Sequence, residues 1–350
     1  YEYVNLNPEN PNNLYIDSLH IFFYLVIFLL QNIFFLAPYF FLSSKQKNNL
    51  YKIFSNLIKW NLFCDNFNIR NFLTYHDYSS SSILRNIILK KRKCNTVHYK
   101  HTNSETVFDK KKFHLYNNIL FAYHYYDYEN HWTEESANMS KKDLSKSSNV
   151  IISGPVWSVF GKSANKKKKK IISFFTTSIN KTGCVNSRLD HIYYLDFLVE
   201  ILKKNKNFLL YFKPKYNLKN VISNDKILEA RFRLLKKYKN FNICKSKSSI
   251  SLINKSNLII SMPFASTSIE GIFSEKNSVY LDFLDKFPNN CYKDIPQFVI
   301  TSKKIFFNKL IKNLNNDKKL RKNTMMIKKN IFNLRNLNPR YAIMSQLKLH

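Results

Sequence analysis

One segment, Asn257–Asp282, constrains the fold of this 350-residue chain more than any other. Within it, Leu258–Ile260 is a short apolar run of the kind that forms a strand buried on both faces. Pro263 ends that strand, because proline cannot donate to a strand ladder. A hydroxyl-rich turn, a helical pattern and a second apolar run at Val279–Leu281 follow. The segment therefore predicts strand, turn, helix and strand, which is the repeating unit of an α/β fold with a parallel sheet.

The turn in this segment carries Ser266, Thr267 and Ser268. The first turn of a helix has unpaired backbone N–H groups and the positive end of the helix dipole, so hydroxyls there make a candidate phosphate site. Glu270 lies one helical turn beyond Ser266, and its carboxylate could accept two ribose hydroxyls. The plain alternative is a hydroxyl that caps the helix and a Glu270 that complements the dipole, since helix N-termini commonly carry these residues.

The sequence Ser261-Met-Pro-Phe-Ala-Ser-Thr-Ser-Ile-Glu270, with Tyr280-Leu-Asp282 downstream, resembles the signature of the bacterial polysaccharide-biosynthesis PFTS-motif proteins. The threonine of that name is Ala265 in this chain. Looser matches to the same family occur in the expected order, at Tyr75–Ser79 with Arg85 and Asn86, Tyr99–Thr102, Gly154–Ser158, Phe174–Asn180 and Lys213–Lys215. Members of this family are similar to glycosyltransferases of the GT-B type. The resemblance thus implies two Rossmann-like α/β domains facing a cleft.

The resemblance also implies a function. It predicts a glycosyltransferase-like enzyme of bacterial surface polysaccharide biosynthesis, which transfers a sugar from a nucleotide-sugar donor to a glycan or lipid-linked acceptor. Ser266, Thr267 and Ser268 would hold the donor phosphates with help from Lys213, and Glu270 would hold the ribose. In a chain with this much lysine, the alternative for Lys213 is a solvent-exposed cation.

Two candidates for the catalytic base lie in the first half of the chain. Asp77 follows a predicted strand at Asn71–Tyr75, and His101 follows a predicted strand at Thr96–Tyr99. Ligands of open α/β sheets bind at the carboxyl ends of strands, so either group could deprotonate an acceptor hydroxyl. The alternative is a turn-capping Asp77 and surface histidines. The sequence has no Asp-x-Asp motif, so we expect no obligatory metal or cofactor, with positive charge and the helix dipole stabilising the leaving diphosphate.

The chain is strongly basic, with a formal net charge of +33. That charge favours anionic partners, namely a nucleotide, an anionic lipid surface or an acidic glycan. The sequence lacks the patterns of RNP, helix-turn-helix and zinc-finger modules, so we expect no nucleic-acid partner. Its five cysteines are dispersed and include no Cys-x-x-Cys pair, which is typical of a reducing compartment and argues against a disulfide or zinc framework.

An apolar, uncharged segment at Leu19–Leu42 is long enough to span a bilayer, and Lys45, Lys47 and Lys52 follow it as expected for a cytoplasmic flank. The alternatives are a hydrophobic helix buried in the first domain and a hairpin lying in the membrane interface. The sequence therefore predicts a cytoplasmic protein associated with the cytoplasmic face of the inner membrane. Because the chain starts at Tyr1, we also expect it to be a fragment of a longer product.

The lysine run at Lys166–Lys170 is typical of a solvated linker and divides the predicted architecture. Strands and helices alternate most clearly after it. The predicted divisions are a hydrophobic N-terminal helical segment (1–62), an acceptor-side Rossmann-like domain (63–160), a basic linker (161–170), a nucleotide-sugar-binding Rossmann-like domain (171–314), and a C-terminal basic helix and tail (315–350).

Two other functions fit the same sequence. One is another nucleotide-sugar enzyme on this scaffold, such as an epimerase or a glycerophosphate-type transferase, because fold alone does not determine chemistry. The other is a non-catalytic, membrane-associated polysaccharide assembly protein, which would have no affinity for nucleotides.

Overall fold

The computed structural model describes residues 26, 43–75, 80–99, 125–143, 149–155, 169–177, 186–215, 225–244, 248–312, 314 and 316–332. Contacts divide the chain into two compact units. The described part of the first lies within 26–98 and 125–128, and that of the second comprises 99, 129–143 and 149–332. Among the helices in these ranges, none combines the length and the apolar character needed to cross a membrane. The predicted apolar segment Leu19–Leu42 lies outside the described residues, apart from Val26.

The first unit contains helices α3 (Ser44–Asn66) and α4 (Ser80–Lys91) and the parallel strands β1 (Asn71–Thr74) and β2 (Asn95–Tyr99). The guanidinium of the buried Arg85 lies 4.6 Å from the centre of the Phe72 ring and 5.6 Å from that of Trp60. Arg85 also donates to the Tyr126 hydroxyl at 2.9 Å. A buried cation is expensive unless it is paired, and these aromatic and hydrogen-bond partners offset that cost.

The sheet that contains β1 and β2 has four strands, in the order β1-β2-β3-β4. Strand β3 (Tyr128–His131) is followed by helix α6 (Glu134–Asp143) and strand β4 (Asn149–Ile152). The sequence pattern predicts strands at Asn71–Tyr75, Thr96–Tyr99 and Val150–Ser153 and a helix at Ser81–Lys91. These match β1, β2, β4 and α4 within one residue at each end. It does not predict β3 or α6, because the polar run Tyr-Glu-Asn-His lacks the apolar alternation of a strand.

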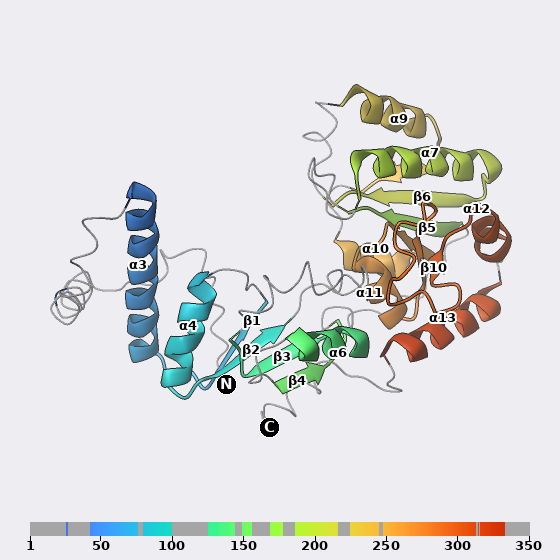
Figure 1. The fold of residues 1–350 in the computed structure, drawn as a ribbon. Helices are drawn as coiled ribbons and strands as arrows, with labels where there is room; N and C mark the ends of the chain where they lie inside the picture. Colours follow the sequence, from blue (N-terminus) through green and yellow to red (C-terminus); the bar gives the residue numbers. More distant parts are fainter. Residues whose placement is uncertain are drawn as a thin grey trace. The chain divides into compact units, whose positions relative to one another are not determined.

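The second unit is built on a six-stranded sheet in the order β10-β9-β8-β5-β6-β7, with every neighbouring pair parallel. Figure 1 labels β5, β6 and β10 of this sheet. The strands are β5 (Lys170–Phe175), β6 (Phe208–Lys213), β7 (Phe241–Ile243), β8 (Leu258–Ser261), β9 (Asn277–Leu281) and β10 (Val299–Ile300). The chain forms β5, β6 and β7 in one direction, then returns to add β8, β9 and β10 on the other side of β5. This is the strand order of a Rossmann fold, and it confirms the predicted α/β class.

Helices cover both faces of this sheet. On one face, Ile172, Leu210, Ile260 and Val279 pack in one core with α7 (Arg188–Lys204), α9 (Lys226–Lys236) and the π-helical segment at Phe306–Ile311, which follows the short α12 (Lys303–Ile305). On the other face lie α10 (Ser249–Lys255), α11 (Thr267–Phe273) and α13 (Asp317–Phe332). Strands covered on both sides need apolar residues at every position, which is why the run at Leu258–Ile260 predicted β8 correctly.

Helix α11 approaches the sheet very closely at Gly271. A Cβ atom added there would lie 2.7 Å from Ile259 Cδ1 and 2.8 Å from Ser278 Oγ. Only glycine allows this approach, which packs the second half of α11 against Ile259 of β8 and Ser278 of β9.

Candidate functional site

The point where the strand order reverses, between β5 and β8, is where ligands bind in open α/β sheets. The register aligns the carboxyl ends of three strands there, because Phe175 at the end of β5 pairs with Lys213 of β6 on one side and with Ser261 of β8 on the other. Two strand spacings separate Lys213 from Ser261, which is about 10 Å between their Cα atoms. The structure therefore brings the Lys213 and PFTS segments, predicted as one site, to the same edge of the sheet.

The residue after β5 links to the end of β6. The Thr176 N–H donates to the Lys213 carbonyl at 3.3 Å, and the Lys215 N–H donates to the Thr176 hydroxyl at 3.3 Å. These bonds hold the Lys213–Lys215 segment beside the switch point.

The hydroxyls of the PFTS turn have partners within the protein. Ser266 donates to Glu270 Oε1 at 3.0 Å, and the Thr267 and Ser261 hydroxyls lie 2.8 Å apart. Ser268 is fully buried and donates to the Val279 carbonyl at 2.9 Å. Its hydroxyl thus holds α11 against β9, whereas Ser266 and Thr267 are half-buried at the start of the helix. The roles of these residues and Glu270 in binding phosphate and ribose stay predictions.

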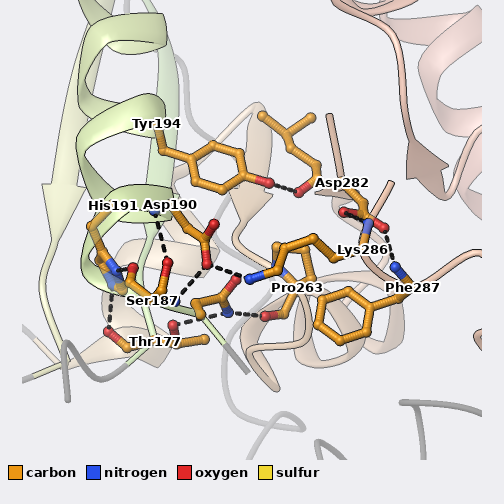
Figure 2. A network of polar contacts seen from close by, with 11 residues as sticks. Thr177, Ser187, Asp190, His191, Tyr194, Pro263, Asp282, Lys286 and Phe287 are labelled. Carbon is orange, nitrogen blue, oxygen red and sulfur yellow. Dashed lines mark hydrogen bonds and ion pairs between the residues drawn. The ribbon is translucent and has the colours of Figure 1, made fainter. Parts of the chain in front are cut away.

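A set of polar residues to which the sequence analysis assigned no role lies at the same edge (Figure 2). We call it the carboxyl-edge network, and it consists of Asn186, Asp190, His191, Asp282 and Lys286. The Asn186 amide donates to the Pro263 carbonyl and, at 3.1 Å, to the Thr177 hydroxyl.

Asp190, in the first turn of α7, pairs with Lys286 at 2.6 Å, although its side chain is only 6% exposed. The network therefore ties the start of α7 to the PFTS segment and to the chain that follows β9.

Two members of the network are titratable groups with shifted pKa values. Burial lowers the pKa of the His191 imidazole, so the ring is neutral at pH 7. A neutral ring has one N–H, so it can donate to only one of its two neighbours, the Ser187 carbonyl 2.9 Å from Nδ1 or the Thr177 carbonyl 3.4 Å from Nε2. Burial raises the pKa of the Asp282 carboxyl, although the Lys286 and Phe287 N–H groups that donate to it act in the opposite direction.

A second buried polar group lies on β3 and α6. His131 Nδ1 is 2.8 Å from the Ser136 hydroxyl, and its Nε2 is 3.5 Å from Glu129 Oε2. The side chains of Glu129 and His131 are completely buried. They follow each other at a spacing of two, so both lie on the same face of β3. Buried ionisable pairs occur often at functional sites. The Glu-x-His spacing in the sequence was the signal that could have identified this pair.

The two predicted catalytic bases, Asp77 and His101, lie outside the described residues, as does most of the predicted linker at 161–170. Within the described ranges, no group of three or more His, Cys, Asp or Glu side chains is placed to hold a metal ion. Catalysis without a metal and the predicted domain limits stay predictions.

Comparison with known families gives one match. Residues 30–307 match the family described as polysaccharide biosynthesis PFTS motif protein. No curated protein matches the chain.

Comparison with solved structures gives distant relatives. The UDP-GlcNAc 2-epimerase from Neisseria meningitidis, bound to UDP-GlcNAc, is 13% identical with a TM-score of 0.53 over 84% of this chain and 80% of that one. An α,α-trehalose-phosphate synthase (UDP-forming) from Burkholderia vietnamiensis is 8% identical with a TM-score of 0.53, over 88% and 78%. The wall teichoic acid polymerase TagF is 14% identical with a TM-score of 0.50, over 80% and 72%.

These likenesses confirm the predicted GT-B-like fold. Identities this low carry the fold alone. The chain spans only 56% of the length of one longer neighbour.

Proposed function

The chain belongs to the family of polysaccharide biosynthesis PFTS motif proteins, and we propose that it is a glycosyltransferase of bacterial surface polysaccharide synthesis that uses a nucleotide-sugar donor. The observation that carries this proposal is the convergence of the PFTS segment, the Lys213 segment and the carboxyl-edge network at the switch point of the six-stranded sheet. Nucleotides bind at this point in folds with this strand order.

In the proposed donor complex, Lys213 ion-pairs with the diphosphate as a point charge. Ser266 and Glu270 exchange their mutual 3.0 Å hydrogen bond for bonds to the nucleotide, with Glu270 accepting from the ribose hydroxyls. Thr267 contributes its half-buried hydroxyl to a phosphate. Ser268 acts by positioning α11, because the Val279 carbonyl already accepts its proton.

Transfer would be direct. An acceptor hydroxyl attacks the anomeric carbon, the bond from that carbon to the diphosphate oxygen breaks, and the acceptor proton passes to a base, for which Asp77 and His101 remain the candidates. Positive charge at the carboxyl edge would stabilise the leaving diphosphate. We propose a glycan or a lipid-linked molecule as acceptor, presented at the cytoplasmic face of the inner membrane, on the ground of the apolar segment Leu19–Leu42.

The test is thermal unfolding of the full 350-residue chain with UDP, GDP, CMP, CDP and TDP sugars. A ligand at 100 times its Kd should add about 2.7 kcal/mol of stability. We expect one nucleotide class to stabilise the wild type and to lose its effect on Glu270→Gln. The matched control is Glu229→Gln on α9, whose carboxylate pairs with Arg233 on the surface and should leave ligand stabilisation unchanged.

The same experiment separates the alternatives. If no nucleotide sugar stabilises a cooperatively folded sample, the donor-site proposal is wrong and the assembly-protein alternative gains. If one does, incubation with that donor should release free nucleotide only when sugar is transferred to an acceptor or to water. An epimerase would instead convert the donor into a second nucleotide sugar.

A further inference from the structure

Helix α13 has two contrasting faces. Its buried face consists of Leu320, Thr324, Ile327 and Ile331, which pack within the second unit, and Phe332 is buried at the end of the helix. Through this face the helix contacts α11, β9 and α6. The packing fixes the rotation of α13, so the side chains on the opposite face share one direction.

Among the α13 residues whose side chains the structure describes, those on the exposed face include cations and no carboxylate. Its charged residues are Lys318, Lys319, Arg321, Lys322 and Lys329, and all five are exposed. Within the part of the chain that the structure describes, none of the five has an ion-pair partner. Lys328, at the margin of the face, differs because it pairs with Glu275 at 3.2 Å.

Two methionines lie inside this cationic arc. Met325 and Met326 are 45% and 39% exposed. At 100° per residue, Met325 falls between Arg321 and Lys329, and Met326 falls between Lys322 and Lys319. Methionine side chains are flexible and apolar, so each can enter an apolar layer while the longer lysines around it reach outward.

We propose that this face of α13 docks on an anionic lipid surface, with the five cations at the phosphate level and the two methionines among the upper acyl chains. An amphipathic helix that lies in a membrane interface has this combination of cations and apolar side chains. A nucleic acid or an acidic glycan would match the charge but would leave the methionines without a partner. The inference deepens the proposed function by placing the enzyme at the surface that holds a lipid-linked acceptor, but the docking stands independently of sugar transfer.

Helix α9 provides a control within the same unit. It exposes two apolar side chains to nearly the same extent, Ile227 at 45% and Leu234 at 38%. Its arginines are paired, however, Arg231 with Asp196 and Arg233 with Glu229. Exposed apolar groups and lysines therefore occur elsewhere on this basic chain, and only a comparison of the two helices can assign binding to α13.

The experiment is flotation of the full chain with vesicles of phosphatidylglycerol and phosphatidylcholine, and with vesicles of phosphatidylcholine alone. The α13 variant is Lys318→Gln with Lys322→Gln and Lys329→Gln. The control changes the same charge through Lys226→Gln, Lys236→Gln and Lys237→Gln, which are exposed on or next to α9. Every variant keeps the Leu19–Leu42 segment, so its contribution cancels.

We expect the α13 variant to bind the anionic vesicles about 100-fold more weakly than wild type, since each cation near such a surface contributes about 1 kcal/mol. The control should lose less than about threefold. Met325→Gln with Met326→Gln should also weaken vesicle binding, more than Ile227→Gln with Leu234→Gln does.

If the α13 and α9 lysine variants lost vesicle binding equally, net charge alone would explain the binding and the proposal would be overturned. It would also be overturned if neither variant lost binding. The methionine variant could bind vesicles as well as wild type does, while heparin or a single-stranded oligonucleotide binds tightly in a manner that depends on α13. In that case the partner of this face would be a soluble polyanion and not a lipid surface. Nucleotide-sugar stabilisation, measured on the same variants, should equal that of wild type. A failure of docking is thereby distinguished from a failure of the donor-site proposal.

Discussion

The body of the six-stranded sheet and its carboxyl edge are built from opposite kinds of residue. In the body, Leu258, Ile260 and Val279 are fully buried among apolar neighbours on strands covered by helices on both faces. At the edge, the carboxyl-edge network gathers polar side chains from the start of α7 and the residues just before it, and from the chain that follows β9, and four of its five members are buried. Burial of apolar surface stabilises the fold, whereas buried polar groups stabilise it little. The difference indicates that the body supplies stability, and under the proposed function the edge supplies recognition of the nucleotide sugar.

Ile260→Ala should have the largest effect, a loss of stability in the body of the sheet. Ile260 is fully buried, and removing its side-chain atoms leaves a cavity that should lower the free energy of unfolding by about 2–5 kcal/mol. Urea unfolding measures this loss. Ile227→Ala, at a side chain that is 45% exposed, is the control and should change stability by less than about 0.5 kcal/mol. Similar losses at both sites would contradict the assignment of stability to the body.

Gly271→Ala tests the contact that joins the body to the edge. The added methyl would meet Ile259 Cδ1 and Ser278 Oγ, and overpacking of this kind should cost about 1–3 kcal/mol. Because α11 carries the PFTS residues, we also expect weaker stabilisation by the nucleotide sugar. Ile259→Val removes the closest clashing atom, so the double variant should be less destabilised than the sum of the two single changes. Simple additivity in urea unfolding would show that the close approach is not the cause.

The sequence was sufficient for the body and insufficient for the edge. The apolar runs at Leu258–Ile260 and Val279–Leu281 are local signals, and they predicted β8 and β9. The PFTS turn was recognisable because its residues are contiguous. Asp190 and Lys286, in contrast, lie 96 positions apart and meet only when α7 and the chain after β9 reach the same edge. Strand β3 escaped prediction for a related reason, since its buried Glu129 and His131 have the pattern of a loop.

Asp190→Asn tests the carboxyl edge, where we expect a small loss of stability and a larger loss of ligand stabilisation. The ion pair with Lys286 is partly exposed on the lysine side, so its loss should cost about 1 kcal/mol or less in urea unfolding. Stabilisation by the nucleotide sugar should fall much further, because the start of α7 would no longer be tied to the chain after β9. The control is Asp196→Asn, also on α7, which breaks the surface pair with Arg231 of α9. It should leave ligand stabilisation intact. Equal ligand effects in the two variants would remove Asp190 from the site.

The smallest expected effect is a pH dependence from His191. Burial lowers the pKa of this imidazole in the folded state below its ordinary value of 6.5, so the unfolded chain binds more protons near that pH. Stability should therefore be fully present above about pH 6.5 and fall as the pH drops toward the folded-state pKa. Asp282 acts oppositely at lower pH, because burial raises its pKa and the folded state then holds the extra proton. His191→Gln keeps a hydrogen-bond donor but has no such titration, so thermal unfolding between pH 5 and 7 should depend less on pH than it does for wild type. If the pH dependence of thermal unfolding were the same in His191→Gln and wild type, another group would be responsible for it. His191 would then not be a buried neutral imidazole that distinguishes the edge from the body.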